Sequence, residues 1–226
     1  MIFLFDRYEY QFIKSNSQLR KFNKKDFIII QCVEDYYFLL LYKEIIQIEK
    51  KSVIGYITIP LTVSLLDYFL IIPLILKVLI NQFRKYKWKK LYNSIGVNTF
   101  VNPSDFFLVS FFRNIFKILK YYNRIKTKNN LIDLKINDLK IGDLLYDTIV
   151  RFNRKTPTVN LKGFLYLKFL TLTLENIRFN DLLLKRYNFS KCFFSQGVYT
   201  YHGIPVRQFI ENNKHVFTLG GLIQTF

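Results

Sequence analysis

The chain has 226 residues, half of them hydrophobic, which suffices for one large domain or one lobe of a two-domain protein. Apolar and polar residues are interspersed throughout, which excludes an intrinsically disordered chain. The two cysteines, Cys32 and Cys192, belong to no CxxC or metal-ligand spacing, so buried free thiols in a reducing cytoplasm are expected.

The net charge of +18 is unevenly distributed. Residues 68–132 hold 12 Lys and Arg and a single acid, Asp105, which gives net +11 in 65 residues. A localised basic field attracts phosphate, nucleic acid or an anionic membrane surface.

The N-terminal part predicts a β-α-β unit. Residues 1–25 form a segment without a clear pattern, and the first twelve lack the features of a signal peptide. The runs DFIIIQC (26–32) and SVIGYITI (52–59) are typical of buried parallel strands, and a helix is expected over 36–50. Such a unit has parallel strands and a right-handed crossover.

The most hydrophobic stretch covers residues 60–80. Asp67 and Lys77 interrupt it and Pro73 would kink it, so a core or surface-lying helix is favoured over a membrane span. Residues 77–92 continue it as a basic helix with an apolar side.

Residues 93–101 predict a turn and a third strand, and residues 102–105 (NPSD) are a strong helix start. The helix is expected to run to about residue 123. Four basic residues share its polar face: Arg113, Lys117, Lys120 and Arg124.

The C-terminal half continues the alternation. The expected elements are a strand at 131–134, a short helix from 142 that Thr156-Pro157-Thr158 ends, a long helix over 163–187, a strand at 191–195, a helix at 203–211 and a strand at 215–219. The order predicts an α/β domain over 26–221 with a mainly parallel sheet flanked by helices. Ligands in such sheets collect at the carboxyl ends of the strands.

One helix face gathers chemistry-bearing side chains. Asp143, Asp147 and Arg151 are spaced i, i+4, i+8 in LKIGDLLYDTIVR (139–151), after a turn that contains Gly142. An ordinary amphipathic helix with structural ion pairs gives the same spacing.

The segment SQGVYTYHGIPVR (195–207) is a strand-to-helix loop of the kind that carries function. It contains Gln196, Tyr199, Tyr201, His202 and Arg207. A loop histidine acts as a general base or contacts phosphate; the alternative is a surface histidine that caps or stacks locally.

Gly220 and Gly221 follow the last expected strand and would bring backbone N–H groups near a phosphate, although an ordinary turn has the same sequence. No GxGxxG, Walker A, HExxH, GxSxG or DxD pattern is present, so neither a metal nor a cofactor is expected.

Four segments carry a resemblance to a known family: KWKKLYNSIGV (87–97), KIGDLLYDTIVR (140–151), SQGVYTYHGIPVR (195–207) and NKHVFTLGG (213–221). Together they resemble bacterial surface-carbohydrate or capsular-polysaccharide biosynthesis proteins, over most of residues 26–221. IGDLLYD is the most specific part. The family is expected to have a histidine near position 196, where this chain has Gln196.

The resemblance implies the N-terminal, Rossmann-like lobe of a GT-B-type glycosyltransferase. The second lobe, which holds most of the nucleotide-sugar site, would be missing, and residues 222–226 would be its truncated start. The partners would be a nucleotide-sugar donor and a glycan or lipid-linked acceptor, in the cytoplasm or on the inner membrane face. This lobe alone is expected to be inactive.

Residue roles follow from this hypothesis. Asp143, Asp147 and His202 are the catalytic candidates. The substrate-binding candidates are Gly142, Tyr146, Arg151, Gln196, Tyr199, Tyr201, Arg207, Gly220 and Gly221. Two other hypotheses remain: a non-catalytic basic protein on an anionic membrane surface and, ranked last, a nucleic-acid binder, because no helix-turn-helix, RNP or zinc pattern is present.

The hypothesis also predicts a geometry. Asp143, Asp147 and Arg151 should face the same cleft as residues 199–207, because both segments are expected to follow strands at the carboxyl edge of the sheet.

Overall fold

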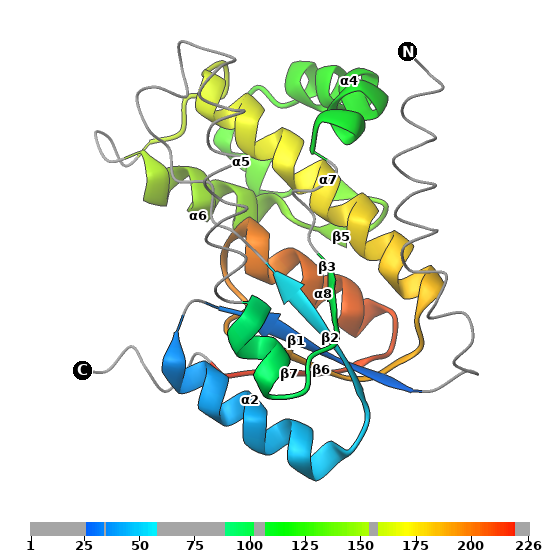
Figure 1. The fold of residues 1–226 in the computed structure, drawn as a ribbon. Coiled ribbons are helices and arrows are strands. Elements are labelled where there is room, and N and C mark those ends of the chain that lie inside the picture. The colour runs from blue at the N-terminus through cyan, green and yellow to red at the C-terminus, as the bar shows by residue number, and fades with distance from the viewer. Residues whose placement is uncertain (1–25, 34, 58–88, 102–106, 154–157, 220–226) are drawn as a thin grey trace.

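The computed structural model describes residues 26–33, 35–57, 89–101, 107–153 and 158–219 (Figure 1). Several predicted features lie outside these residues: the segments 1–25, 60–80 and 222–226, most of the basic segment 77–92, the helix start at 102–105, and Gly220 and Gly221.

A five-stranded sheet forms the centre of the fold. Its strands lie in the order β3 (Thr99–Val101), β2 (Ser52–Ile57), β1 (Phe27–Cys32), β6 (Phe189–Phe194) and β7 (His215–Thr218). All four pairings are parallel. Every residue of β1 is buried, as expected for the central strand of a parallel sheet. The predicted α/β class with a mainly parallel sheet is confirmed.

The strand order reverses at β1. β2 and β3 extend the sheet on one side of β1, whereas β6 and β7 extend it on the other. This order is Rossmann-like, and its switch point lies between the carboxyl ends of β1 and β6. The residues that follow these two strands therefore occupy the place where open α/β sheets bind ligands.

Helix α2 (Tyr36–Glu49) covers one face of the sheet and connects β1 to β2 (Figure 1). Its N-cap, Asp35, accepts a hydrogen bond from the backbone N–H of Tyr37 at 2.8 Å. The buried side chain of Tyr42 shares a hydrophobic cluster with Ile30 of β1.

Helices α7 (Phe164–Arg186) and α8 (Ile204–Glu211) cover the opposite face. Ile29 of β1 shares a buried cluster with Phe209 of α8. Because successive strand residues point to opposite faces, Gln31 lies on the same side as Ile29. The sequence therefore places an amide side chain beneath α7 and α8 at the carboxyl end of β1.

A further group of helices packs on α7. Helix α4 (Phe107–Arg124) packs on α7 on the side away from the sheet (Figure 1). Helix α6 (Gly142–Phe152) and the π-helical turn η4 (Tyr199–Gly203) also contact α7. Their apolar side chains form one buried cluster, separate from the two that line the sheet.

The predicted strand at 131–134 is wrong. Residues Lys128–Ile132 form a short helix, α5, because the Thr127 hydroxyl caps it and accepts a hydrogen bond from the Asn130 N–H at 3.2 Å. A two-stranded antiparallel hairpin follows, with β4 (Lys135–Ile136) and β5 (Leu139–Lys140). Its turn residues, Asn137 and Asp138, have φ of 51° and 65°, the left-handed conformation that tight hairpins require.

Helix α6 therefore follows this hairpin and not a strand of the main sheet. It ends at Phe152, earlier than the predicted stop at 156–158, with the Asn153 N–H donating to the Ile149 carbonyl at 2.8 Å. The other predicted helices and strands that fall on described residues are confirmed, with ends within a few residues.

Candidate functional site

A buried hydrogen-bonded pair closes the switch point between β1 and β6. The Gln31 side chain is completely buried, and its Oε1 accepts hydrogen bonds from the Ser195 backbone N–H at 2.8 Å and from the Ser195 hydroxyl at 2.7 Å. A backbone N–H can only donate, so the atom that faces it must be the amide oxygen. The Gln31 Nε2 on the other branch therefore carries the two hydrogens.

This amide orientation fixes the tautomer of His202. The Gln31 Nε2 lies 2.5 Å from the His202 Nδ1. Because Nε2 of Gln31 is a donor, Nδ1 of His202 must accept, and the ring proton of a neutral imidazole then lies on the His202 Nε2. Ser195, Gln31 and His202 thus form a directed chain across the carboxyl ends of two neighbouring strands.

The imidazole is also held neutral. Burial, as the larger cause, and the nearby positive charge of Arg151 together lower the pKa of His202 from 6.5 to about 4. At neutral pH the ring is uncharged. Among the described residues, no hydrogen-bond partner meets its Nε2–H.

Turn η4 positions His202. It is a π-helical turn, a form found frequently at functional sites, and Tyr199 begins it with a φ of 60°. The Thr148 hydroxyl of α6 accepts from the Thr200 N–H at 2.9 Å and donates to the Leu144 carbonyl at 2.6 Å. The bond from the Thr200 N–H joins η4 to α6, and the bond to the Leu144 carbonyl lies within α6.

Close packing adds to this attachment. A Cβ on Gly203, the last residue of η4, would lie 2.6 Å from a methyl group of Leu144 and 2.7 Å from the Gly197 carbonyl oxygen. The backbone of η4 therefore approaches α6 at a distance that only glycine permits.

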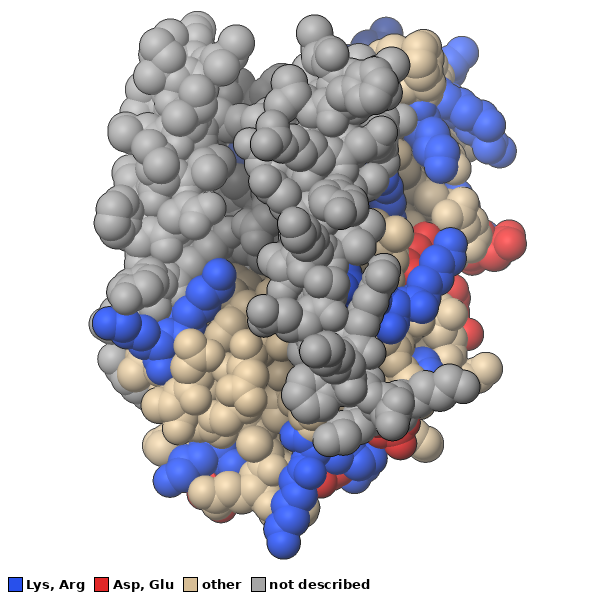
Figure 2. All heavy atoms as spheres, turned by 45° about the vertical axis from the view of Figure 1, so that its right-hand side comes forward, with Lys and Arg blue, Asp and Glu red and all other residues tan. Residues whose placement is uncertain are grey.

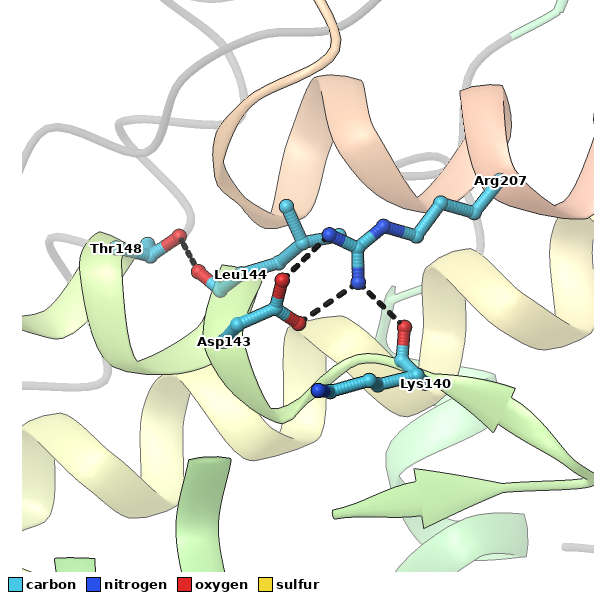
Figure 3. A network of polar contacts seen from close by, with 5 residues as sticks. All are labelled: Lys140, Asp143, Leu144, Thr148 and Arg207. Atoms are coloured by element: carbon cyan, nitrogen blue, oxygen red, sulfur yellow. Dashed lines mark hydrogen bonds and ion pairs between the residues drawn. The ribbon is translucent and has the colours of Figure 1, made fainter. Parts of the chain in front are cut away.

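Asp143 of α6 and Arg207 of α8 form a second contact. Both guanidinium amino groups of Arg207 donate to the Asp143 carboxylate, one to each oxygen, at 2.7 and 2.5 Å. Arg207 also donates to the Lys140 carbonyl at 2.7 Å (Figure 3). These hydrogen bonds are the main cause of the lowered pKa of Asp143, so its carboxylate is ionised and occupied.

Arg151 makes the third contact. Its guanidinium donates to the Tyr199 hydroxyl at 2.7 Å and lies 4.7 Å from the centre of the same ring. Asp143 and Arg151 of α6 thus both contact residues 199–207, as predicted for these two of the three side chains. The predicted reason was wrong for α6, which leaves the small hairpin; the packing of η4 and α8 on α6 brings the segments together.

The other candidates have different surroundings. Asp147 is exposed, and its charge contributes to raising the pKa of Arg207. Tyr146 is partly buried beneath the Lys128 ammonium group at 4.7 Å. Tyr201 is buried and packs edge-on against Phe152. These contacts do not bear on their predicted substrate roles.

Gly142 has a backbone role in the fold. A Cβ on it would lie 1.8 Å from the Leu131 carbonyl oxygen, so a side chain would separate α5 from the start of α6. Gln196 is partly buried next to Ser195.

Sequence reasoning missed Gln31, Ser195 and Thr148 as positioning residues. A signal for Gln31 was available, because it is the one polar residue within the buried run FIIIQC, at the end where ligands bind. Its partner His202 lies 171 residues later in the chain, so the pairing itself needed the structure.

Within the described residues, no group of three or more His, Cys, Asp or Glu side chains is placed to hold a metal ion. The helices described there are too short or too polar to cross a bilayer. Comparisons of the chain with protein-family models, with curated proteins and with solved structures give no match.

Proposed function

We propose that the chain is the acceptor-side lobe of a glycosyltransferase that builds a surface or capsular polysaccharide. The observation that carries the proposal is the neutral His202 at the switch point, whose Nε2–H meets no acceptor among the described residues. A neutral N–H donor suits the hydroxyl oxygen of an uncharged sugar. It can orient the hydroxyl by a hydrogen bond, whereas a protonated imidazole would also attract an anion.

The start of α2 supports an acceptor role over a nucleotide role. Rossmann-like lobes that bind dinucleotides place the pyrophosphate on a glycine-rich turn and the following helix N-terminus. Here that turn is CVED (32–35), without glycine, and Asp35 places a carboxylate on the N-terminal N–H groups of α2. A phosphate would meet a like charge at this position.

The polar contacts indicate different roles for His202, Asp143 and Asp147. His202 orients the acceptor and does not serve as its base, because its accepting nitrogen is occupied by Gln31 and its pKa is about 4. Asp143 is occupied by Arg207. Asp147 is the exposed carboxylate on the same helix face, so it is the candidate for accepting the proton of the acceptor hydroxyl.

The nucleotide-sugar donor belongs, in this proposal, to a second lobe. Proton transfer to Asp147 would accompany attack of the acceptor oxygen on the donor sugar, with the nucleoside diphosphate as leaving group. The described residues of this lobe would then contribute orientation of the acceptor and exclusion of water.

The test is glycan binding by the purified chain on an array of oligosaccharides from bacterial surface polysaccharides, with UDP-sugars tested in parallel. We expect binding of at least one oligosaccharide, lost in His202→Phe and kept in His215→Phe, which changes the exposed histidine of β7. Binding of UDP-sugars without any oligosaccharide, or equal binding by both variants, would contradict the acceptor assignment.

A further inference from the structure

The outward face of α4 combines exposed apolar side chains with positive charge. Phe116 is 82% exposed and Leu119 is 47% exposed, whereas Ile118 of the same helix is buried in the cluster on α7. Exposure of single apolar residues is ordinary. Two large ones on one helix face, one turn apart, form a small apolar ridge.

Basic residues accompany this ridge. Lys120 and Arg124 are exposed and follow Phe116 at i+4 and i+8, so they lie on the same face. From residue 116 to residue 130 the sequence has five Lys and Arg and no Asp or Glu. Figure 2 shows Lys and Arg side chains at the upper end of the described part, the end where Figure 1 places α4, and others at its middle and lower end.

Helix α2 exposes apolar side chains without this positive charge at the central i+4 position. Its Leu40 and Ile48 are 63% and 76% exposed and are spaced i, i+8, which is the spacing of Phe116 and Arg124 in α4. The residue between them is Glu44, however, where α4 has Lys120. The two helices expose comparable apolar surface and differ in the sign of the central charge.

We propose that the outer face of α4, formed by Phe116, Leu119, Lys120 and Arg124, lies on a bilayer surface that contains anionic lipid. A helix that rests in the interfacial plane inserts apolar side chains between headgroups while its basic side chains pair with lipid phosphates. This inference stands apart from the proposed function, because it needs neither His202 nor a sugar ligand.

Two other occupants fit the face less well. A second copy of the chain would bring Lys120 and Arg124 against the same charges, which repel one another. Nucleic acid would attract the basic residues but would gain little from the aliphatic Leu119, since bases stack on aromatic rings.

The experiment is sedimentation of the purified chain with vesicles of phosphatidylglycerol and phosphatidylcholine, and with vesicles of phosphatidylcholine alone. We expect binding to the anionic vesicles only, weakened by added salt. Phe116→Asp should abolish it, and Ile48→Asp on α2 is the matched control that should leave it unchanged. Each of Lys120→Gln and Arg124→Gln should lower the vesicle affinity about fivefold.

Three results would overturn the proposal. The first is equal binding to neutral and anionic vesicles, and the second is full binding by Phe116→Asp. The third is displacement of the protein from vesicles by short duplex DNA, combined with an equal loss of vesicle binding in Phe116→Asp and Ile48→Asp. Circular dichroism of each variant separates lost binding from lost folding. Glycan binding by Phe116→Asp should remain normal, which distinguishes failure of this inference from failure of the acceptor assignment.

Discussion

Two polar clusters hold the segment formed by η4 and α8, and they differ in what they leave free. The Asp143–Arg207 pair is about one third exposed, and both carboxylate oxygens accept hydrogen bonds from the guanidinium. The Ser195–Gln31–His202 chain is buried at the switch point and ends in a donor without a partner among the described residues. The Asp143–Arg207 pair therefore joins two helices, whereas the His202 Nε2–H can still donate a hydrogen bond.

The largest effect is expected for Gln31→Leu. The change keeps a buried side chain but leaves the Ser195 N–H, the Ser195 hydroxyl and the His202 Nδ1 without their partner. An unsatisfied buried polar group costs about 1–3 kcal/mol, so the free energy of unfolding should fall by at least about 2 kcal/mol. Denaturant unfolding measures this free energy. A loss below about 0.5 kcal/mol would show that the hydrogen bonds among Ser195, Gln31 and His202 are not integral to the fold.

Gln31→Glu sharpens the same comparison. A carboxylate still accepts from Ser195 but cannot donate to Nδ1, so His202 should take a proton on that nitrogen and its pKa should rise. Glycan binding should then depend on pH near neutrality, unlike that of the wild type. An unchanged pH profile of binding would argue against the Gln31–His202 hydrogen bond as the control of the ring.

Thr148→Val should have the next largest effect. It removes the acceptor of the buried Thr200 N–H with little change in side-chain shape, which should cost about 1–2 kcal/mol in thermal or chemical unfolding. Thr148→Ser is the control, because it keeps the hydroxyl. Equal stability of the Val and Ser variants would mean that packing at Gly203, and not this bond, joins η4 to α6.

The smallest effect is expected for Asp143→Asn. The pair is substantially exposed, so its contribution at pH 7 should be below about 1 kcal/mol. The pKa of Asp143 is lowered in the folded state, so the contribution is present above the ordinary Asp pKa of 3.8 and is lost as the pH falls through the lowered value. Unfolding of wild type and variant should therefore differ at pH 7 and converge in strong acid. A loss of several kcal/mol in the free energy of unfolding would contradict this, because the pair would then stabilise the fold as much as the buried hydrogen bonds of Gln31.

Much of the fold could be predicted because its signals are local. FIIIQC is a run of buried β-branched residues, and the apolar spacing of residues 163–187 is that of a helix. The error at 131–134 arose where two local signals competed: short apolar spacing favoured a strand, while Thr127 as a cap and Asn137-Asp138 as a turn favoured a helix and a hairpin.

The candidate site could be predicted only in part. Residues 143, 151 and 199–207 were selected because charge, aromatic and loop signals mark them in the sequence. Gln31 was passed over, since a single amide in an apolar strand gains meaning only from what folds against it. The π-helical form of η4 likewise depends on contacts with α6 and α7 that no local pattern shows.

The most direct test of the central claim is the protonation of His202, followed by nitrogen NMR on chain labelled in its histidine imidazoles. His202→Gln identifies which of the two histidine signals belongs to this ring. We predict a neutral ring with its proton on Nε2 at pH 7, and a pKa of about 4. A proton on Nδ1, or a pKa at or above the ordinary value of about 6.5, would contradict the account.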